Sequence, residues 1–225
     1  MIVLKAVIMV LIGYLSGSVS YAVILTRMIA KTDIRAIGNK NAGTMNVLRN
    51  VSKGPGVLVG ILDGLKSLLP MLLARLLWFP EASALHFFIV FAAGIAALAG
   101  HWKPLFYSFK GGRGVGCIVG IFLFLIPFEF LISFLLGGII VVVFIHGVKY
   151  RLGRWVPILF VLITPFFTLA LNFLVDLRIS AHYSLGGHEW YVLLGVFATS
   201  LSMLFINLTF MGRRVDELKG EEAED

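Results

Sequence analysis

Long apolar runs dominate this chain and leave few folds open to it except helices that cross a membrane. Short stretches carrying most of the charge separate seven such runs: 2–30, 57–78, 84–99, 115–126, 128–145, 156–174 and 190–210. A helix needs about 20 apolar residues to cross a hydrocarbon layer, and backbone groups in lipid must bond to one another. With 59% hydrophobic and 14% charged residues, the chain is predicted to be an all-α, polytopic integral membrane protein.

The segment 115–145 decides the number of helices, because it reads either as one long helix or as two short ones broken at Pro127. Two helices place every strongly basic loop on one side of the membrane: 27–53, 103–113, 149–154 and 213–219. With one helix, the last basic loop and the C-terminal tail change compartments, against the positive-inside rule. We therefore predict seven transmembrane helices in residues 1–212, with the N-terminus outside. A cytoplasmic charged tail is expected at 213–225.

One loop combines basic side chains with glycines at the point where an apolar run begins. It extends from Gly100 to Val115 and holds a histidine, two lysines and an arginine. Backbone N–H groups at a helix start, together with fixed positive charge, hold phosphate in proteins. The other interpretation is a basic turn that only sets topology. The following run is too short to cross about 30 Å, which would recess the loop into a cavity facing the cytoplasm. The predicted phosphate ligands are Lys110, Gly111, Gly112, Arg113 and Gly114.

Another loop lies earlier in the chain, at residues 33–49, and is called the first loop; the glycine-rich loop from Gly100 to Val115 is the second loop. The first loop lies on the same predicted side and is rich in amide and basic side chains. Asn39, Asn41, Asn46 and Arg49 offer donors to hydroxyl groups and phosphate oxygens. Either loop alone is weak evidence for a binding site. Two such loops on one face can close on one ligand.

Polar residues also occur inside the first two spans. Ser18 belongs to a run of small residues in the first span, which allows close helix contact. Asp63 and Lys66 are three residues apart in the second span, so they share a helix face and can pair. Such a pair either shapes a site or only fixes helix packing.

The net charge of +7 lies in loops between the apolar runs. We assign it to membrane orientation, anionic lipid and phosphate rather than to nucleic acid. The five histidines are scattered, and no cluster of Cys, His or carboxylate residues has metal-ligand spacing. We expect neither a metal nor an organic cofactor.

Several ordered motifs resemble the bacterial membrane glycerol-3-phosphate acyltransferases that take acyl phosphate as donor. They are Gly17-Ser18 with Tyr21, the segment from Asn41 to Arg49, the pair Asp63 and Lys66, and the segment from Gly100 to Val115. The family's fold has seven helices and an outside N-terminus, in agreement with the topology that the basic loops predict by the positive-inside rule. The resemblance implies a multi-pass protein of the bacterial cytoplasmic (inner) membrane with its active site facing the cytoplasm.

The resemblance implies transfer of a fatty acyl group from acyl phosphate to the 1-hydroxyl of glycerol 3-phosphate. The products are lysophosphatidic acid, for phospholipid synthesis, and inorganic phosphate. On this interpretation the glycine-rich loop holds the leaving phosphate, and Lys40, Asn41, Asn46 and Arg49 hold glycerol 3-phosphate. His101 is the candidate proton acceptor, although a phosphate oxygen of the substrate could serve instead. Ser18, Asp63 and Lys66 would shape the site.

The chain departs from the family pattern at three places. Asn39-Lys40 stands where the family usually has Ser-Gly, so Asn39 occupies the position of an expected active-site hydroxyl. The segment 151–154 replaces a serine-containing turn, and 210–222 lacks the family's C-terminal histidine. These departures motivate an alternative, a catalytically degenerate relative that binds a phosphorylated lipid precursor. A transporter of a phosphorylated metabolite is a further alternative, although the outer loops carry no matching basic motif.

Overall fold

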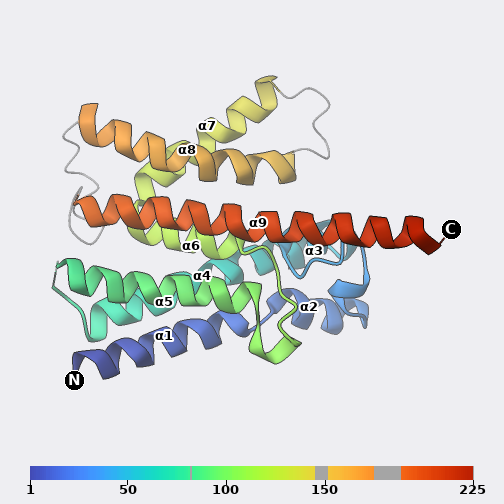
Figure 1. Ribbon diagram of the computed structural model, residues 1–225, viewed down its shortest axis with the longest axis horizontal. Helices are drawn as coiled ribbons and strands as arrows, with labels where there is room; N and C mark the ends of the chain where they lie inside the picture. Colours follow the sequence, from blue (N-terminus) through green and yellow to red (C-terminus); the bar gives the residue numbers. More distant parts are fainter. Residues whose placement is uncertain (82, 145–151, 175–188, 225) are drawn as a thin grey trace.

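The computed structural model describes residues 1–81, 83–144, 152–174 and 189–224, and every regular element within them is helical (Figure 1). Within the described residues, each of the seven predicted runs is helical over most of its length. In chain order the elements are α1 (Ile2–Ser18), α2 (Tyr21–Ala30), η1 (Ile34–Ala36), α3 (Thr44–Asn50), α4 (Lys53–Leu77), α5 (Ala84–Trp102), η2 (Leu105–Tyr107), α6 (Val115–Leu125), α7 (Pro127–Phe144), α8 (Leu152–Leu174) and α9 (Trp190–Glu224).

Breaks in the helices lie at residues that leave the helical conformation. The first run divides into α1 and α2 because Val19 and Ser20 are extended. Segment 115–145 forms two helices, as the distribution of the basic loops predicted, and α7 begins at Pro127. A proline at the first helical position costs little, because the N–H that it lacks would have no partner there. At the C-terminal end, α9 continues through residue 212 without interruption.

The helices differ in their capacity to cross a membrane. Within the described residues, four are long and apolar enough: Ile2–Ala30, Lys53–Leu77, Ala84–Tyr107 and Trp190–Phe210. Three shorter apolar helices lie at Val115–Leu125, Pro127–Val143 and Leu159–Asn172. The 11 residues of α6 cover roughly 16 Å at 1.5 Å per residue, about half of a hydrocarbon layer. The all-α membrane fold is confirmed, while the count of seven spans stays a prediction.

Helices α1 and α5 lie side by side (Figure 1). Their backbones approach closely because glycines of α1 place no side chain between the two helices. A Cβ on Gly13 would lie 3.0 Å from the carbonyl carbon of Ala93, and one on Gly17 would lie 2.7 Å from that of Ala97. Both distances are shorter than an ordinary carbon contact of about 3.5–4.0 Å. The small residues of the first span therefore serve close helix contact, as the structural interpretation predicted.

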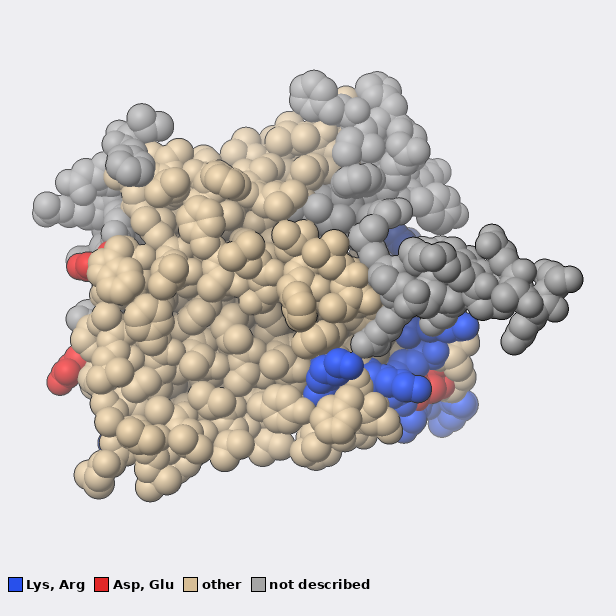
Figure 2. Space-filling view, viewed as in Figure 1, with Lys and Arg blue, Asp and Glu red and all other residues tan. Residues whose placement is uncertain are grey.

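The main hydrophobic core lies among α4, α5, α6 and α9, and Phe130 of α7 and Phe160 of α8 extend it. Helices α7 and α8 lie together at one side of the molecule (Figure 1). The largest fully buried side chains of the core include Met71, Phe87, Ile121 and Phe122. Figure 2 shows that the lysine and arginine side chains gather at one end of the molecule, over α2 and α3. The loop between α5 and α6 reaches the same end, so the two predicted binding loops are neighbours.

Candidate active site

The glycine-rich loop ends where α6 begins, and the backbone donors of the first turn have no intrahelical acceptor there. Gly114 has a φ of +80°, a left-handed conformation that glycine adopts without steric cost. The first intrahelical bond joins the Ile118 N–H to the Gly114 carbonyl at 3.0 Å. The N–H groups of Val115, Gly116 and Cys117 therefore have no acceptor within the helix. Together with the helix dipole, they suit the start of α6 to an anion.

Gly112 is bonded within the protein. Its N–H donates to the His101 carbonyl at 3.1 Å, which occupies in this structure the donor that was predicted to bind phosphate. A Cβ on Gly112 would lie 2.5 Å from the Ala42 carbonyl oxygen, and one on Gly111 would lie 2.6 Å from Pro104 Cδ. Both glycines thus let the loop lie directly on the end of α5, and Gly112 also brings it onto the first loop.

Asp63, Lys66 and His101 form a buried cluster beneath this loop. Lys66 Nζ lies 2.8 Å from Asp63 Oδ1 and 3.3 Å from His101 Nδ1. It also lies 5.1 Å from the centre of the Tyr21 ring, whose face attracts a cation. The three polar residues are only 2%, 2% and 5% exposed. In the described part of the chain, no group of three or more His, Cys, Asp or Glu residues could hold a metal ion.

Asn46 holds the first loop in shape through internal hydrogen bonds. Its amide nitrogen lies 3.0 Å from each of three carbonyl oxygens, those of Ile34, Ile37 and Asn41. Its side-chain oxygen accepts from Asn50 at 2.8 Å. The residue is 2% exposed and its polar atoms are occupied, so in this structure Asn46 positions the first loop; its contact with glycerol phosphate stays a prediction.

Arg35 joins the first loop to the second. It donates to the Tyr107 carbonyl at 3.1 Å and to both carboxylate oxygens of Asp33, at 2.8 and 3.0 Å. The hydrogen bond from Arg35 holds the pKa of Asp33 well below its usual range, and Arg27 adds to this effect. The same pairing raises the pKa of Arg35. The expectation that two loops meet on one face is therefore met by the described contacts.

The predicted cationic ligands lie at the outer side of this junction. Lys110, Lys40 and Arg49 are exposed to solvent, while the Arg113 guanidinium lies 5.5 Å from the centre of the Phe210 ring on α9. Lys40 has a φ of +58°, which disfavours any residue other than glycine. This conformation accounts for the glycine that the resemblance leads us to expect at position 40.

Ser18 and Tyr14 anchor the start of the second loop to α1. The Tyr14 hydroxyl donates to the Lys103 carbonyl at 2.8 Å, and the Ser18 hydroxyl accepts from the Leu105 N–H at 3.2 Å. Ser18 therefore holds the start of the second loop against α1. Asn39 lies away from these contacts at the exposed surface, where its side-chain oxygen accepts from the Asn41 N–H at 3.2 Å.

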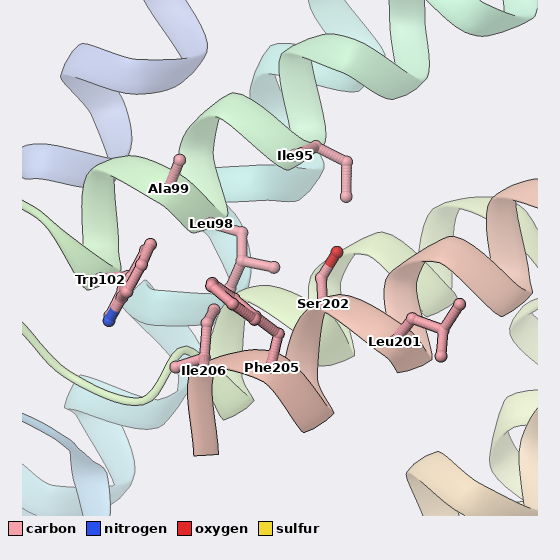
Figure 3. Close-up of a pocket in the computed structure, with 8 residues that line it drawn as sticks. All are labelled: Ile95, Leu98, Ala99, Trp102, Leu201, Ser202, Phe205 and Ile206. Carbon is pink, nitrogen blue, oxygen red and sulfur yellow. The ribbon is translucent and has the colours of Figure 1, made fainter. Parts of the chain in front are cut away.

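An apolar pocket of about 340 Å³ lies between α5 and α9 (Figure 3). Trp102 and Phe205 both line it and make an edge-to-face contact at 5.7 Å between ring centres. Leu98 lines the pocket and also approaches Gly114, so the pocket adjoins the start of α6. Its lining residues are Ile95, Leu98, Ala99, Trp102, Leu201, Ser202, Phe205 and Ile206.

A sequence profile described as "Glycerol-3-phosphate acyltransferase" matches residues 7–211. The chain belongs to the glycerol-3-phosphate acyltransferase family. A glycerol-3-phosphate acyltransferase of Shouchella clausii is 36% identical over 189 residues, which cover 80% of this chain and 87% of that protein. One of Albidiferax ferrireducens is 40% identical over 117 residues, 52% of this chain and 51% of that protein. The matched stretch thus spans about half the length of the second relative.

Solved structures of the family have the same fold. A crystal structure of PlsY (YgiH), an integral membrane glycerol 3-phosphate acyltransferase, in its glycerol 3-phosphate form shares 26% identity with a TM-score of 0.65. Its lysophosphatidic acid form shares 25% identity with a TM-score of 0.66. Both matches cover 94% of this chain and 92% of the other.

Some residues of the site were missed by sequence reasoning. Tyr21 belongs to one of the motifs that carry the family resemblance, but nothing in the sequence indicated that its ring lies against Lys66. Tyr14 and the Ala42 carbonyl reach the second loop only through the fold. The pair Asp33 and Arg35 carried a usable signal, since opposite charges two residues apart in a short loop favour a local ion pair.

Proposed function

We propose that this chain transfers a fatty acyl group from acyl phosphate to the 1-hydroxyl of glycerol 3-phosphate, producing lysophosphatidic acid and inorganic phosphate. The observation that carries the proposal is a start of α6 with open N–H donors, in contact with a basic loop on one side and an apolar pocket on the other. Such a site suits two phosphates and one hydrocarbon chain. The names of the relatives support the same activity.

The chemistry needs no nucleophilic side chain. The glycerol hydroxyl oxygen forms a bond to the acyl carbon, and the bond from that carbon to the phosphate oxygen breaks. Phosphate leaves with the electron pair, and the hydroxyl proton passes to a phosphate oxygen. The protein holds the two reactants together and neutralises charge in the transition state.

The cationic side chains divide between the two phosphates. Lys110 and Arg113 take the leaving phosphate together with the N–H groups of Gly111, Gly114 and the first turn of α6. Lys40, Asn41 and Arg49 take glycerol 3-phosphate. Charge-assisted hydrogen bonds from such groups are roughly twice as strong as neutral ones.

The fatty chain lies in the pocket between α5 and α9 (Figure 3). Both helices belong to the long apolar set, so an acyl phosphate dissolved in the bilayer can enter sideways. The pocket adjoins Gly114 through Leu98, which places the phosphate end of the donor at the glycine-rich loop.

The proposed enzyme is a multi-pass protein of the bacterial inner membrane with seven spans in residues 1–212. Its N-terminus lies outside, and the site and the charged tail at 213–225 face the cytoplasm. The basic end of the molecule (Figure 2) supports this orientation. The two termini lie at opposite ends (Figure 1), as an odd number of spans requires.

A second candidate is a relative that binds a phosphorylated lipid precursor without turning it over. Asn39 favours it, because a carboxamide held by the Asn41 N–H stands at the position of the hydroxyl that the family usually carries. Activity that appears only after Asn39→Ser would support this candidate.

The test is an assay of purified protein in lipid nanodiscs with palmitoyl phosphate and glycerol 3-phosphate. Release of both phosphate and lysophosphatidic acid is expected, with a clear loss in Lys110→Ala. Lys5→Ala is the matched control, because Lys5 lies on α1 near Trp78 and outside the site. Absence of product with every acyl length, in wild type and in Asn39→Ser, would refute the transferase.

A further inference from the structure

The cluster of Asp63, Lys66 and His101 determines which nitrogen of His101 carries a proton. An ammonium group has three N–H donors and no acceptor. Lys66 is paired with the Asp63 carboxylate and lies against the Tyr21 ring, which are the surroundings of a charged amine. Its 3.3 Å contact with His101 Nδ1 therefore requires a lone pair on Nδ1.

The proton of the neutral ring then sits on Nε2. A doubly protonated ring is excluded by the same contact, since an N–H on Nδ1 would point at the ammonium hydrogens. Asp63 does not change this, because its Oδ1 lies 3.6 Å from Nδ1, beyond hydrogen-bond distance. The charged groups facing the ring are thus Lys66 and Asp63, both from α4.

Nε2 points to the place where the two loops meet. An added Cβ on Gly112 would contact His101 Nε2 and lie 2.5 Å from the Ala42 oxygen. The hydrogen bond of the ring in the described part of the chain is the one through Nδ1. The Nε2–H donor therefore faces the junction of the glycine-rich loop and the first loop, beside the start of α6.

We infer that His101 is a neutral hydrogen-bond donor, fixed in its Nε2–H form by Lys66, for an anionic oxygen that binds where the two loops meet. This inference rests on the proposed function and replaces the candidate role of His101 as proton acceptor. The lone pair that a general base needs is on Nδ1 and is turned towards Lys66. Lys66 acts through His101 and is a positioning residue.

Nitrogen NMR of protein labelled with ¹⁵N-histidine tests the tautomer without any turnover. The His101 signals, assigned by their loss in His101→Gln, should show an unprotonated Nδ1 and a protonated Nε2 at neutral pH. The double variant Asp63→Asn with Lys66→Met removes the donor and leaves no unpaired carboxylate, so both tautomers should appear. Lys5→Met is the matched control. An Nδ1–H form in wild type would overturn the inference.

Kinetics separates a donor from a base. Glutamine at 101 keeps an N–H donor at similar reach but cannot accept a proton, so His101→Gln should stay within about tenfold of wild type in kcat. His101→Leu should lose about 10²–10³-fold, the usual cost of one donor to a developing charge. Equal losses in both variants, with both folded as judged by melting temperature, would overturn the donor role. An inactive wild type with the expected NMR signals would instead count against the proposed function.

Discussion

A single methyl group at Gly17 tests whether the contact between α1 and α5 supports the site. In Gly17→Ala the new Cβ would lie 2.7 Å from the carbonyl carbon of Ala97 and 2.9 Å from its Cα. Carbon atoms in contact are normally about 3.5–4.0 Å apart. Because both atoms are backbone and cannot rotate away, the two helices must separate by about 1 Å.

This separation also breaks hydrogen bonds at the second loop. The Tyr14 to Lys103 and Leu105 to Ser18 bonds, now 2.8 and 3.2 Å, lengthen to or beyond the usual limit. Each contributes about 1 kcal/mol, and overpacking costs about 1–3 kcal/mol. Replacing a helical glycine returns about 0.5–1 kcal/mol. The net expectation is a loss of about 2–4 kcal/mol.

Thermal unfolding at one scan rate measures this loss. For a chain of this size, the melting temperature should fall by roughly 4–16 °C. Gly138→Ala is the matched control, because Gly138 also lies inside an apolar helix but has nothing within 4 Å of an added Cβ. It should melt at or slightly above wild type. Equal melting temperatures for the two variants would refute the reasoning.

Three further results are expected. Lys40→Gly should raise the stability by about 0.5–1 kcal/mol by relieving the left-handed conformation, and should raise the KM for glycerol 3-phosphate; an unchanged KM would remove Lys40 from the site. The lowered pKa of Asp33 stabilises the fold above about pH 4 and ceases to do so as the pH falls further. Melting temperatures should therefore fall with acidification more in wild type than in Asp33→Asn, and parallel curves would contradict this. Ile206→Trp should fill the pocket and lower kcat/KM for palmitoyl phosphate by about tenfold or more relative to octanoyl phosphate. The expected loss is about 0.8 kcal/mol per excluded methylene. An unchanged ratio of the two kcat/KM values would show that the fatty acyl chain binds outside this pocket.

Local patterns in the sequence predicted the helical framework. Apolar runs bounded by charge marked the long helices, and Pro127 marked the break between α6 and α7. Helix α3, by contrast, lies in the segment that was predicted to be a loop. The small residues around Gly13 and Gly17 predicted close helix contact, although not that α5 would be the partner. These features depend on neighbours within a few residues, so a single chain carries them.

Contacts within the site depend on packing between distant segments, which local patterns do not encode. Lys66 and His101 are 35 residues apart, and only the fold brings Nζ to Nδ1. An asparagine offers the same donors to a ligand or to its own loop, so the sequence did not reveal that the amide of Asn46 is already occupied. Gly112 looked like a phosphate donor for the same reason.

The pairing of α1 with α5 has a consequence for the order in which the protein assembles during synthesis. The partner of Gly13 and Gly17 lies beyond the whole of α4. At about 5–20 residues per second, roughly 4–17 s pass between completion of α1 and completion of α5. During that interval α4 is synthesised first, and the Ser16 hydroxyl can donate a hydrogen bond to its Lys66 carbonyl. Helix α1 must therefore lie in the bilayer without α5 during this interval. In a nascent chain that stops before residue 102, the face of α1 that carries Gly13 and Gly17 lacks part of its partner helix.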